Sequence, residues 1–205
     1  MRLTNVPLPK LLFNGPKSAP LTVALAHGAG APMDTPLMTF FAEGLAKHGF
    51  RVARFEFPYM AVRRKDGKKK PPDRQPVLLD TWHAVIEEIG ADKLVIGGKS
   101  MGGRMASLIA DDAGVRGLLC LGYPFYSAGR KDKPRTEHLT KLKTRTLICQ
   151  GTRDPIGDRA AVSALTLSKK IHLNWAEDGD HDLKPRKASG LTHDQNLTAA
   201  LDAAA

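Results

Sequence analysis

The sequence is poor in the residues that mark secreted, membrane or metal-binding proteins. Its two cysteines, Cys120 and Cys149, both lie inside apolar runs. Free cysteines in such runs are usually buried thiols, so we expect neither a disulfide framework nor a cysteine-rich metal site. No apolar run approaches the roughly 20 residues that a membrane-spanning helix needs, and Pro7, Pro9 and Lys10 interrupt the start before a signal-peptide core can form. We therefore expect a cytoplasmic protein that does not associate with membranes.

Aromatic residues are scarce as well, at 6%, while apolar residues make up 42% and charged residues 25% of the 205 residues. These proportions are typical of an ordinary globular protein and exclude a largely disordered one. The sequence has no internal repeat, low-complexity tract or convincing interdomain linker. Because a chain of this length suffices for one core but not for two ordinary ones, we expect a single domain over residues 1–205.

Acidic residues are outnumbered, since 31 Lys and Arg against 21 Asp and Glu give a formal net charge of +10. Much of the excess lies in residues 63–70, and a smaller basic cluster lies in residues 184–187. Such charge runs are typical of solvated loops. The alternatives are polyanion binding, or a preference for anionic substrates if both clusters overhang a site. Sequence-specific nucleic-acid binding is not expected, because no recognised module and little aromatic interleaving accompany the clusters.

Short aliphatic or β-branched runs alternate along the chain with segments of helical spacing, in which apolar residues recur every three or four positions. The expected strands are residues 21–26, 52–57, 94–96, 117–121, 146–149 and 171–175. The expected helices end before Gly49, Gly90 and Gly114, with two more at about 159–169 and 194–201. This alternation predicts βαβ units and right-handed crossovers. The fold class is therefore α/β, with a mostly parallel sheet of about six or seven strands and helices on both faces.

Ligands of such sheets bind beyond the carboxyl ends of the strands, so the residues that follow each strand are the candidates for chemistry. Residues 98–102, Gly-Lys-Ser-Met-Gly, form a G-x-S-x-G pattern between an expected strand and an expected helix. This is the setting of a nucleophile elbow, in which a strained serine needs small residues two before and two after it. Ser100 is the candidate nucleophile, and the Met101 N–H at the helix start is a candidate oxyanion donor. The structural alternative is a glycine-rich turn with Ser100 as a helix N-cap.

An acid and a histidine follow later strands, in the chain order serine, acid, histidine that a triad on this architecture takes. Asp154 follows the strand at residues 146–149 and is the candidate acid, although an Asx-turn or an N-cap before Pro155 would also explain it. Asp158 is the fallback acid, because it lies further from the strand end.

His181 is the histidine, of seven, that lies on a polar loop after the last expected strand. There an imidazole could reach Ser100 and act as the base, with Asp154 orienting it. The acidic residues at 178, 180 and 182 either raise the pKa of His181 or solvate the loop.

The loop at residues 27–31, after the first expected strand, is expected to supply the second oxyanion donor. The Ala29 N–H is the candidate and the Gly30 N–H is the alternative, because small residues let the backbone approach a substrate oxygen. His27 is expected to brace this loop by hydrogen bonding. Arg104, just after the elbow, is expected to be a structural ion-pair partner.

With these residues in place, the chain resembles the α/β-hydrolase superfamily, and more narrowly a group of small bacterial hydrolases of dienelactone-hydrolase-like size. That branch is also related to a subunit of an animal histone-acetyltransferase complex. The stretches that carry the resemblance are AHGAGAPMD (26–34), GGKSMGGRMAS (97–107), GYPF (122–125), RTEHL (135–139), QGTRDPIG (150–157) and GDHDLKPRK (179–187).

The resemblance implies an α/β-hydrolase fold with little or no cap domain, and its triad lands on Ser100, Asp154 and His181. Residues 126–128, Tyr-Ser-Ala, depart from the His- and Pro-rich stretch expected there, so the excursion at 122–143 is the part that it describes least.

The leading interpretation is a serine hydrolase that cleaves an ester or thioester bond of a small soluble substrate through an acyl-enzyme, without cofactor or metal. A hydrolase-fold protein that binds or scaffolds without turnover is the alternative from another class, since a fold does not guarantee its chemistry. A polyanion-binding protein is the third.

Overall fold

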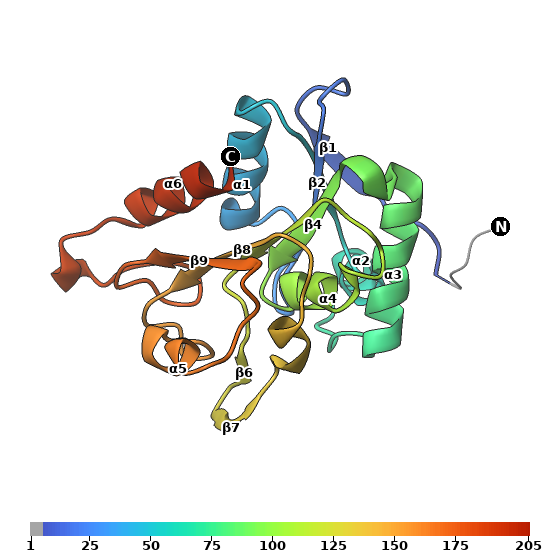
Figure 1. The fold of residues 1–205 in the computed structure, drawn as a ribbon. Helices are drawn as coiled ribbons and strands as arrows, with labels where there is room; N and C mark the ends of the chain where they lie inside the picture. The colour runs from blue at the N-terminus through green and yellow to red at the C-terminus, as the bar shows by residue number, and fades with distance from the viewer. Residues whose placement is uncertain (1–5) are drawn as a thin grey trace.

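A seven-stranded sheet lies at the centre of the protein, in a computed structural model that describes residues 6–205 (Figure 1). The strand order is β1-β3-β2-β4-β5-β8-β9, and only β1 pairs antiparallel, with β3. The strands are β1 (Leu11–Asn14), β2 (Thr22–Ala26), β3 (Arg51–Phe55), β4 (Leu94–Lys99), β5 (Gly117–Leu121), β8 (Thr146–Gly151) and β9 (Ile171–Ala176). The mostly parallel sheet of the expected α/β class is thus confirmed.

Helices cover both faces of this sheet. On one face α1 (Pro36–Lys47) and α6 (His193–Ala204) pack together, and on the other lie α2 (Pro58–Asp66), α3 (Gln75–Ile89), α4 (Met101–Ile109) and the short α5 (Arg159–Ser163) (Figure 1). Single 3₁₀ turns complete the helical structure at η1 (Ala91–Lys93), η2 (Glu137–Thr140) and η3 (Lys187–Ser189).

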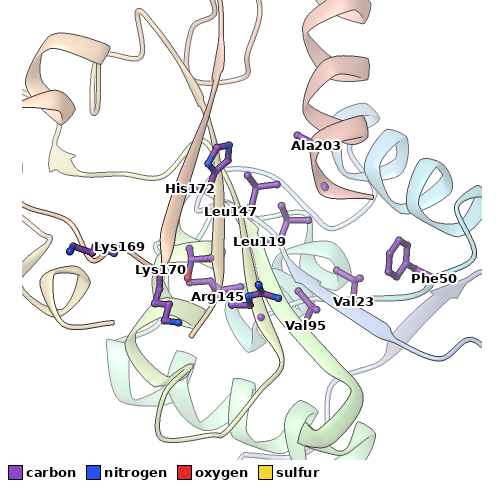
Figure 2. Close-up of a pocket in the computed structure, with 14 residues that line it drawn as sticks. Val23, Phe50, Val95, Leu119, Arg145, Leu147, Lys169, Lys170, His172 and Ala203 are labelled. Atoms are coloured by element: carbon purple, nitrogen blue, oxygen red, sulfur yellow. The ribbon is translucent and has the colours of Figure 1, made fainter. Parts of the chain in front are cut away.

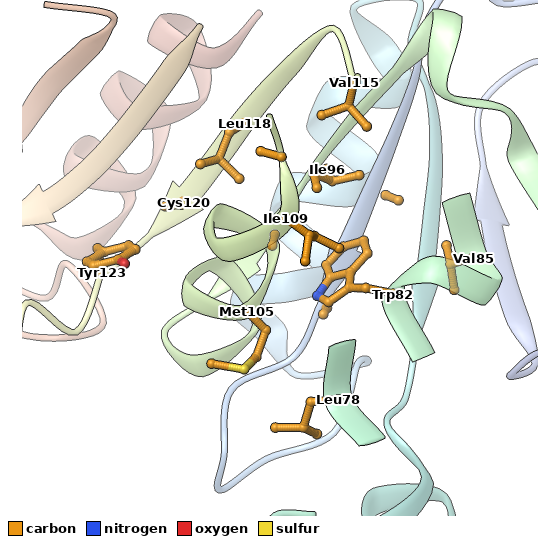
Figure 3. Packing of buried hydrophobic residues seen from close by; sticks show 14 of the residues in the cluster. Leu78, Trp82, Val85, Ile96, Met105, Ile109, Val115, Leu118, Cys120 and Tyr123 are labelled. Carbon is orange, nitrogen blue, oxygen red and sulfur yellow. The ribbon is translucent and has the colours of Figure 1, made fainter. Parts of the chain in front are cut away.

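Two hydrophobic cores result, one on each face. In β2, Val23 and Leu25 belong to the core under α1 and α6, while Ala24 and Ala26 belong to the core under α3 and α4. Since successive strand residues point to opposite faces, a strand buried on both sides reads as a continuous apolar run. Trp82 of α3 is fully buried in the second core, among residues of β4 and α4 (Figure 3).

The basic residues 63–70 are not a loop throughout, because residues 63–66 form the last turn of α2. Pro58 occupies the first turn of this helix, and Tyr59 and Met60 are buried. Arg and Lys in a last turn interact favourably with the helix dipole, so the cluster helps the helix to form. The loop expectation is therefore wrong for residues 63–66, and it holds for residues 68–70.

Other departures lie at the periphery. The strand β1 and the hairpin β6 (Tyr126–Ser127) with β7 (Arg130–Pro134) were not expected, and α5 ends at Ser163 rather than near residue 169. The hairpin and η2 make up the excursion between β5 and β8, and no separate cap domain is evident among the described residues. No helix within residues 6–205 is both long and apolar enough to cross a membrane. Residues 1–5, the start of the segment expected to lack a signal-peptide core, lie outside the described residues.

Candidate active site

The serine of the G-x-S-x-G pattern lies in a sharp turn between β4 and α4. Its backbone has φ 50° and ψ −114°, a conformation that is strained for a residue with a side chain. The Ser100 side chain makes no cap hydrogen bond to α4, so the N-cap alternative does not describe it. Met101 is the first residue of α4, and its N–H has no partner within the helix.

The three predicted side chains form one hydrogen-bonded chain. His181 Nε2 lies 2.9 Å from Ser100 Oγ, and His181 Nδ1 lies 2.7 Å from Asp154 Oδ2. A carboxylate can only accept, so the network assigns the Nδ1–H tautomer, which leaves the Nε2 lone pair facing the Ser100 hydroxyl. This is the arrangement in which an imidazole can remove a proton from an alcohol.

Asp154 is fully buried at the carboxyl end of the sheet. Besides His181, it accepts hydrogen bonds from Gln150 Nε2 at 2.8 Å and from the Ile156 N–H at 3.0 Å. The bond to Ile156 is the Asx-type contact predicted as the structural alternative, and Asp154 makes it together with the bond to His181. The fallback acid, Asp158, instead caps α5 through the Ala161 N–H at 2.9 Å. Sequence reasoning did not single out Gln150.

The loop after β2 is braced by His27, as the sequence predicts. The Phe57 N–H donates to His27 Nε2 at 3.1 Å, so Nδ1 carries the hydrogen and donates to the Gly28 carbonyl at 2.7 Å. Burial lowers the pKa of His27, which keeps the ring neutral and fixes this tautomer.

Side chains of α2 hold the next carbonyls of the same loop. Tyr59 donates its hydroxyl to the Ala29 carbonyl at 2.9 Å, and Arg63 donates to the Gly30 carbonyl at 2.9 Å. In a trans peptide the N–H of the following residue points opposite to the carbonyl. The Ala29 and Gly30 N–H groups therefore point away from His27 and Tyr59. A Cβ on Gly28 would lie 3.7 Å from the Ser100 Cβ, which places the loop against the serine.

Lys99 ties the loop that carries His181 to the elbow. Its ammonium donates to the His181 carbonyl at 2.9 Å and pairs with Asp182 at 3.1 Å, and its side chain is only 11% exposed. Burial lowers the pKa of Lys99, and the charge of Asp182 opposes that shift. The pattern itself does not single out Lys99, because the residues that it contacts lie on a loop about 82 positions further along the chain.

The other two acids of this loop also have local partners. Asp180 accepts the N–H groups of Asp182 at 2.8 Å and Lys184 at 3.0 Å. Hydrogen bonds from Arg186 lower the pKa of Asp178 to about 2. These contacts hold the loop in shape, a role that neither prediction for these acids included.

Two of the six basic residues in the 63–70 cluster form ion pairs. Arg64 lies 2.8 Å from Asp34 and 2.5 Å from Glu56, and Lys70 lies 3.4 Å from Asp66. These pairs neutralise part of the charge of the 63–70 cluster.

A cavity of about 500 Å³ opens beside Ser100 and His181. Its lining comes from residues 28–32, the start of α1, and the side chains of Lys99, Asp182 and His193. Another cavity, of about 550 Å³, lies at the amino-terminal edge of the strands, with Val95, Leu119 and His172 among its lining residues (Figure 2). It contains none of the predicted site residues. Within residues 6–205, no group of three or more His, Cys, Asp and Glu side chains could hold a metal ion.

Solved structures share this architecture over nearly the whole chain. An alpha-beta serine hydrolase homologue from Coxiella burnetii superposes with a TM-score of 0.72 at 18% identity, covering 95% of this chain and 91% of that one. A serine hydrolase without lid from Xanthomonas campestris gives 0.67 at 22% identity, covering 94% and 86%. A dienelactone hydrolase from Anabaena variabilis gives 0.69 at 20% identity, covering 95% and 88%.

At these identities the likeness establishes the fold, and the relation to a histone-acetyltransferase subunit stays a prediction. A protein family described as "Alpha/beta hydrolase domain" matches residues 19–205. That match covers nearly the whole chain and includes both loops and the elbow described above. The chain therefore belongs to the α/β-hydrolase family.

Proposed function

We propose that the protein is a serine hydrolase that cleaves an ester or thioester bond of a small soluble substrate through an acyl-enzyme. The observation that carries this proposal is the chain of hydrogen bonds from Asp154 through His181 to Ser100, at a strained turn that opens on a cavity. Members of a fold family differ in activity, so the proposal rests on the site and not on the fold.

In the first half of the reaction, His181 Nε2 takes the Ser100 proton while Ser100 Oγ attacks the substrate carbonyl carbon. The carbonyl oxygen becomes an oxyanion between the Met101 N–H and the Ala29 N–H, with the Gly30 N–H as the alternative donor. Collapse breaks the bond to the leaving alcohol or thiol, which receives its proton from His181. Asp154 stabilises the imidazolium that forms.

In the second half, His181 removes a proton from water, and the resulting hydroxide attacks the acyl group on Ser100. The acid leaves, and the proton returns from His181 to Ser100. Apart from the substrate and one water molecule, each step uses groups of this chain. A cavity of about 500 Å³ is within the range of small-molecule sites, and Pro32, Pro36 and Leu37 give it an apolar wall for the acyl or alcohol part.

A fluorophosphonate probe tests the nucleophile directly. Wild type is expected to be labelled stoichiometrically, and Ser100→Ala is expected to lose labelling and ester hydrolysis, because no other group is placed to form the covalent bond. Ser163→Ala, at an exposed serine in α5, is the matched control and should react like wild type. Unlabelled wild type would favour the scaffold alternative, and equal labelling of Ser100→Ala would show that another residue is the nucleophile.

Lys99→Met is expected to lower kcat/KM about tenfold, because it removes a charge-assisted hydrogen bond that holds the His181 carbonyl. Lys99→Arg keeps the charge and should recover part of the loss. Lys93→Met, an exposed lysine at the other end of β4, is the control. Steady-state kinetics on an activated ester, with melting temperatures to verify folding, measures the effect. Unchanged kinetics in Lys99→Met would remove Lys99 from the positioning of His181.

A further inference from the structure

Residues from three of the stretches that carry the family resemblance, 97–107, 122–125 and 135–139, contact one another outside the Ser100 site. Ser107 Oγ lies 2.8 Å from His138 Nε2 and 3.1 Å from the Tyr123 hydroxyl. Because Ser107 donates its own hydrogen to the Arg104 carbonyl at 2.7 Å, it accepts from the other two groups. Burial lowers the pKa of His138 to about 4, so its ring is neutral at pH 7. These bonds fix the segment 135–139 against α4.

A cavity of about 600 Å³ opens between α4 and this segment. Arg104 and Leu108 line it from the helix, and residues 134–138, Thr140 and Lys141 line it from the excursion. Its charged lining consists of the half-buried Arg104 and three exposed residues, the cations Arg135 and Lys141 and the acid Glu137. The cavity shares no lining residue with the one beside Ser100.

Arg104 has no ion-pair partner among residues 6–205, so the expectation that it forms a structural ion pair is wrong. The side chain is half-buried, and its Nε is buried without a hydrogen-bond partner. Burial lowers the pKa of Arg104, Tyr123 opposes that shift, and the charge of Arg135 adds a smaller lowering. Glu137 forms no ion pair with either arginine.

Such an arrangement is unfavourable by itself. A cation that loses water without gaining a counterion raises the free energy of the folded state, and a second cation beside it adds repulsion. A bound oxyanion would offset both effects, because the guanidinium fork matches the geometry of a carboxylate or phosphate and its N–H donors are free.

We propose that this cavity binds an oxyanion, a carboxylate or phosphate group, between Arg104 and Arg135. The anion has two sources to consider, a free molecule or a charged group on the hydrolysed substrate. A charged group on the substrate is considered because Arg104 lies one helical turn after Ser100, about 6 Å along the axis of α4, although the two cavities share no lining residue. Binding to the cavity does not depend on the proposed hydrolase activity.

The direct test titrates inorganic phosphate and glutarate into wild type by calorimetry at constant ionic strength. Saturable binding is expected, and Arg104→Gln should weaken it about tenfold or more, with Arg104→Lys intermediate. Arg116→Gln, an exposed arginine at the amino-terminal edge of the sheet, is the matched control and should bind like wild type. Arg104→Gln without anion should melt no lower than wild type, because it relieves repulsion, so lost binding would not reflect unfolding. Absence of saturable binding, or equal binding by the two Gln variants, overturns the proposal.

A second arm distinguishes the sources. Kinetics on a neutral ester and on its carboxylated counterpart should show a raised KM for the carboxylated ester alone in Arg104→Gln, if the anion belongs to the substrate. If both esters react unchanged while phosphate binding is lost, the site serves a free anion. Should the protein lack hydrolase activity altogether, the calorimetric arm still decides the site.

Discussion

Asp154→Asn is expected to lower kcat about 10⁴-fold while the protein remains folded. Asp154 Oδ2 accepts from both His181 Nδ1 and Gln150 Nε2, and Oδ1 accepts from the Ile156 N–H. An asparagine supplies one oxygen where the site uses two. Its NH₂ group would face a donor, and if it faces His181 it favours the tautomer with hydrogen on Nε2. That tautomer cannot accept the Ser100 proton.

The matched control is Asp158→Asn, at the alternative acid. Because asparagine caps helices about as well as aspartate, the cap of α5 should survive and kcat should stay near wild type. Steady-state kinetics and circular dichroism on both variants measure activity and folding. If Asp158→Asn is the variant that loses activity, the acid has been assigned to the wrong residue.

Much of the fold could be predicted because the sheet is buried on both faces. Strands such as β2 and β5 are continuous apolar runs, and the helices between them end near glycines. The hydrophobic pattern of the sequence therefore predicts the alternation of strands and helices directly. The strand β1 lacks this signal because it is an edge strand with partly exposed residues. The helix α2 lacks it as well, since four of its nine residues are charged and only Tyr59 and Met60 are buried.

The same physical argument separates the site residues that could be predicted from those that could not. Ser100, Asp154 and His181 could be selected because each follows a strand, and strand ends meet at one edge of a parallel sheet. Lys99 and Gln150 could not be selected, since both belong to strands and their roles depend on contacts made only after the chain folds. The ion pair predicted for Arg104 is wrong for a similar reason. Its charge predicts a partner, but only the folded arrangement shows that the cavity it lines holds a second arginine, Arg135, and that no acid pairs with it among the described residues.

Gly98→Ala is expected to destabilise the protein by more than about 4 kcal/mol, a large part of the 5–15 kcal/mol that holds a typical domain together. A Cβ at Gly98 would lie 2.0 Å from the Ala26 carbonyl oxygen on the neighbouring strand, and Gly98 has φ +143°. Neither the strand β2 nor the elbow can move away without breaking the ladder that pairs Ala26 with Gly98. Gly114→Ala is the control, because its position also has a positive φ, +64°, but has no atom within 4 Å of a new Cβ. It should cost only about 1 kcal/mol.

Urea unfolding of the two variants separates steric packing from backbone strain. A midpoint for Gly98→Ala close to that of Gly114→Ala would show that the contact between β2 and β4 is not what makes the elbow need glycine. The expected difference has a functional meaning, because a Cβ at Gly102 would also lie 2.4 Å from the Ala26 oxygen and 2.7 Å from the His27 oxygen. Gly98 and Gly102, two residues before and two after Ser100, thus pack closely against the end of β2. The loop with the Ala29 N–H follows directly after that strand end. The packing that makes alanine intolerable there is what brings the serine within reach of its proposed oxyanion donors.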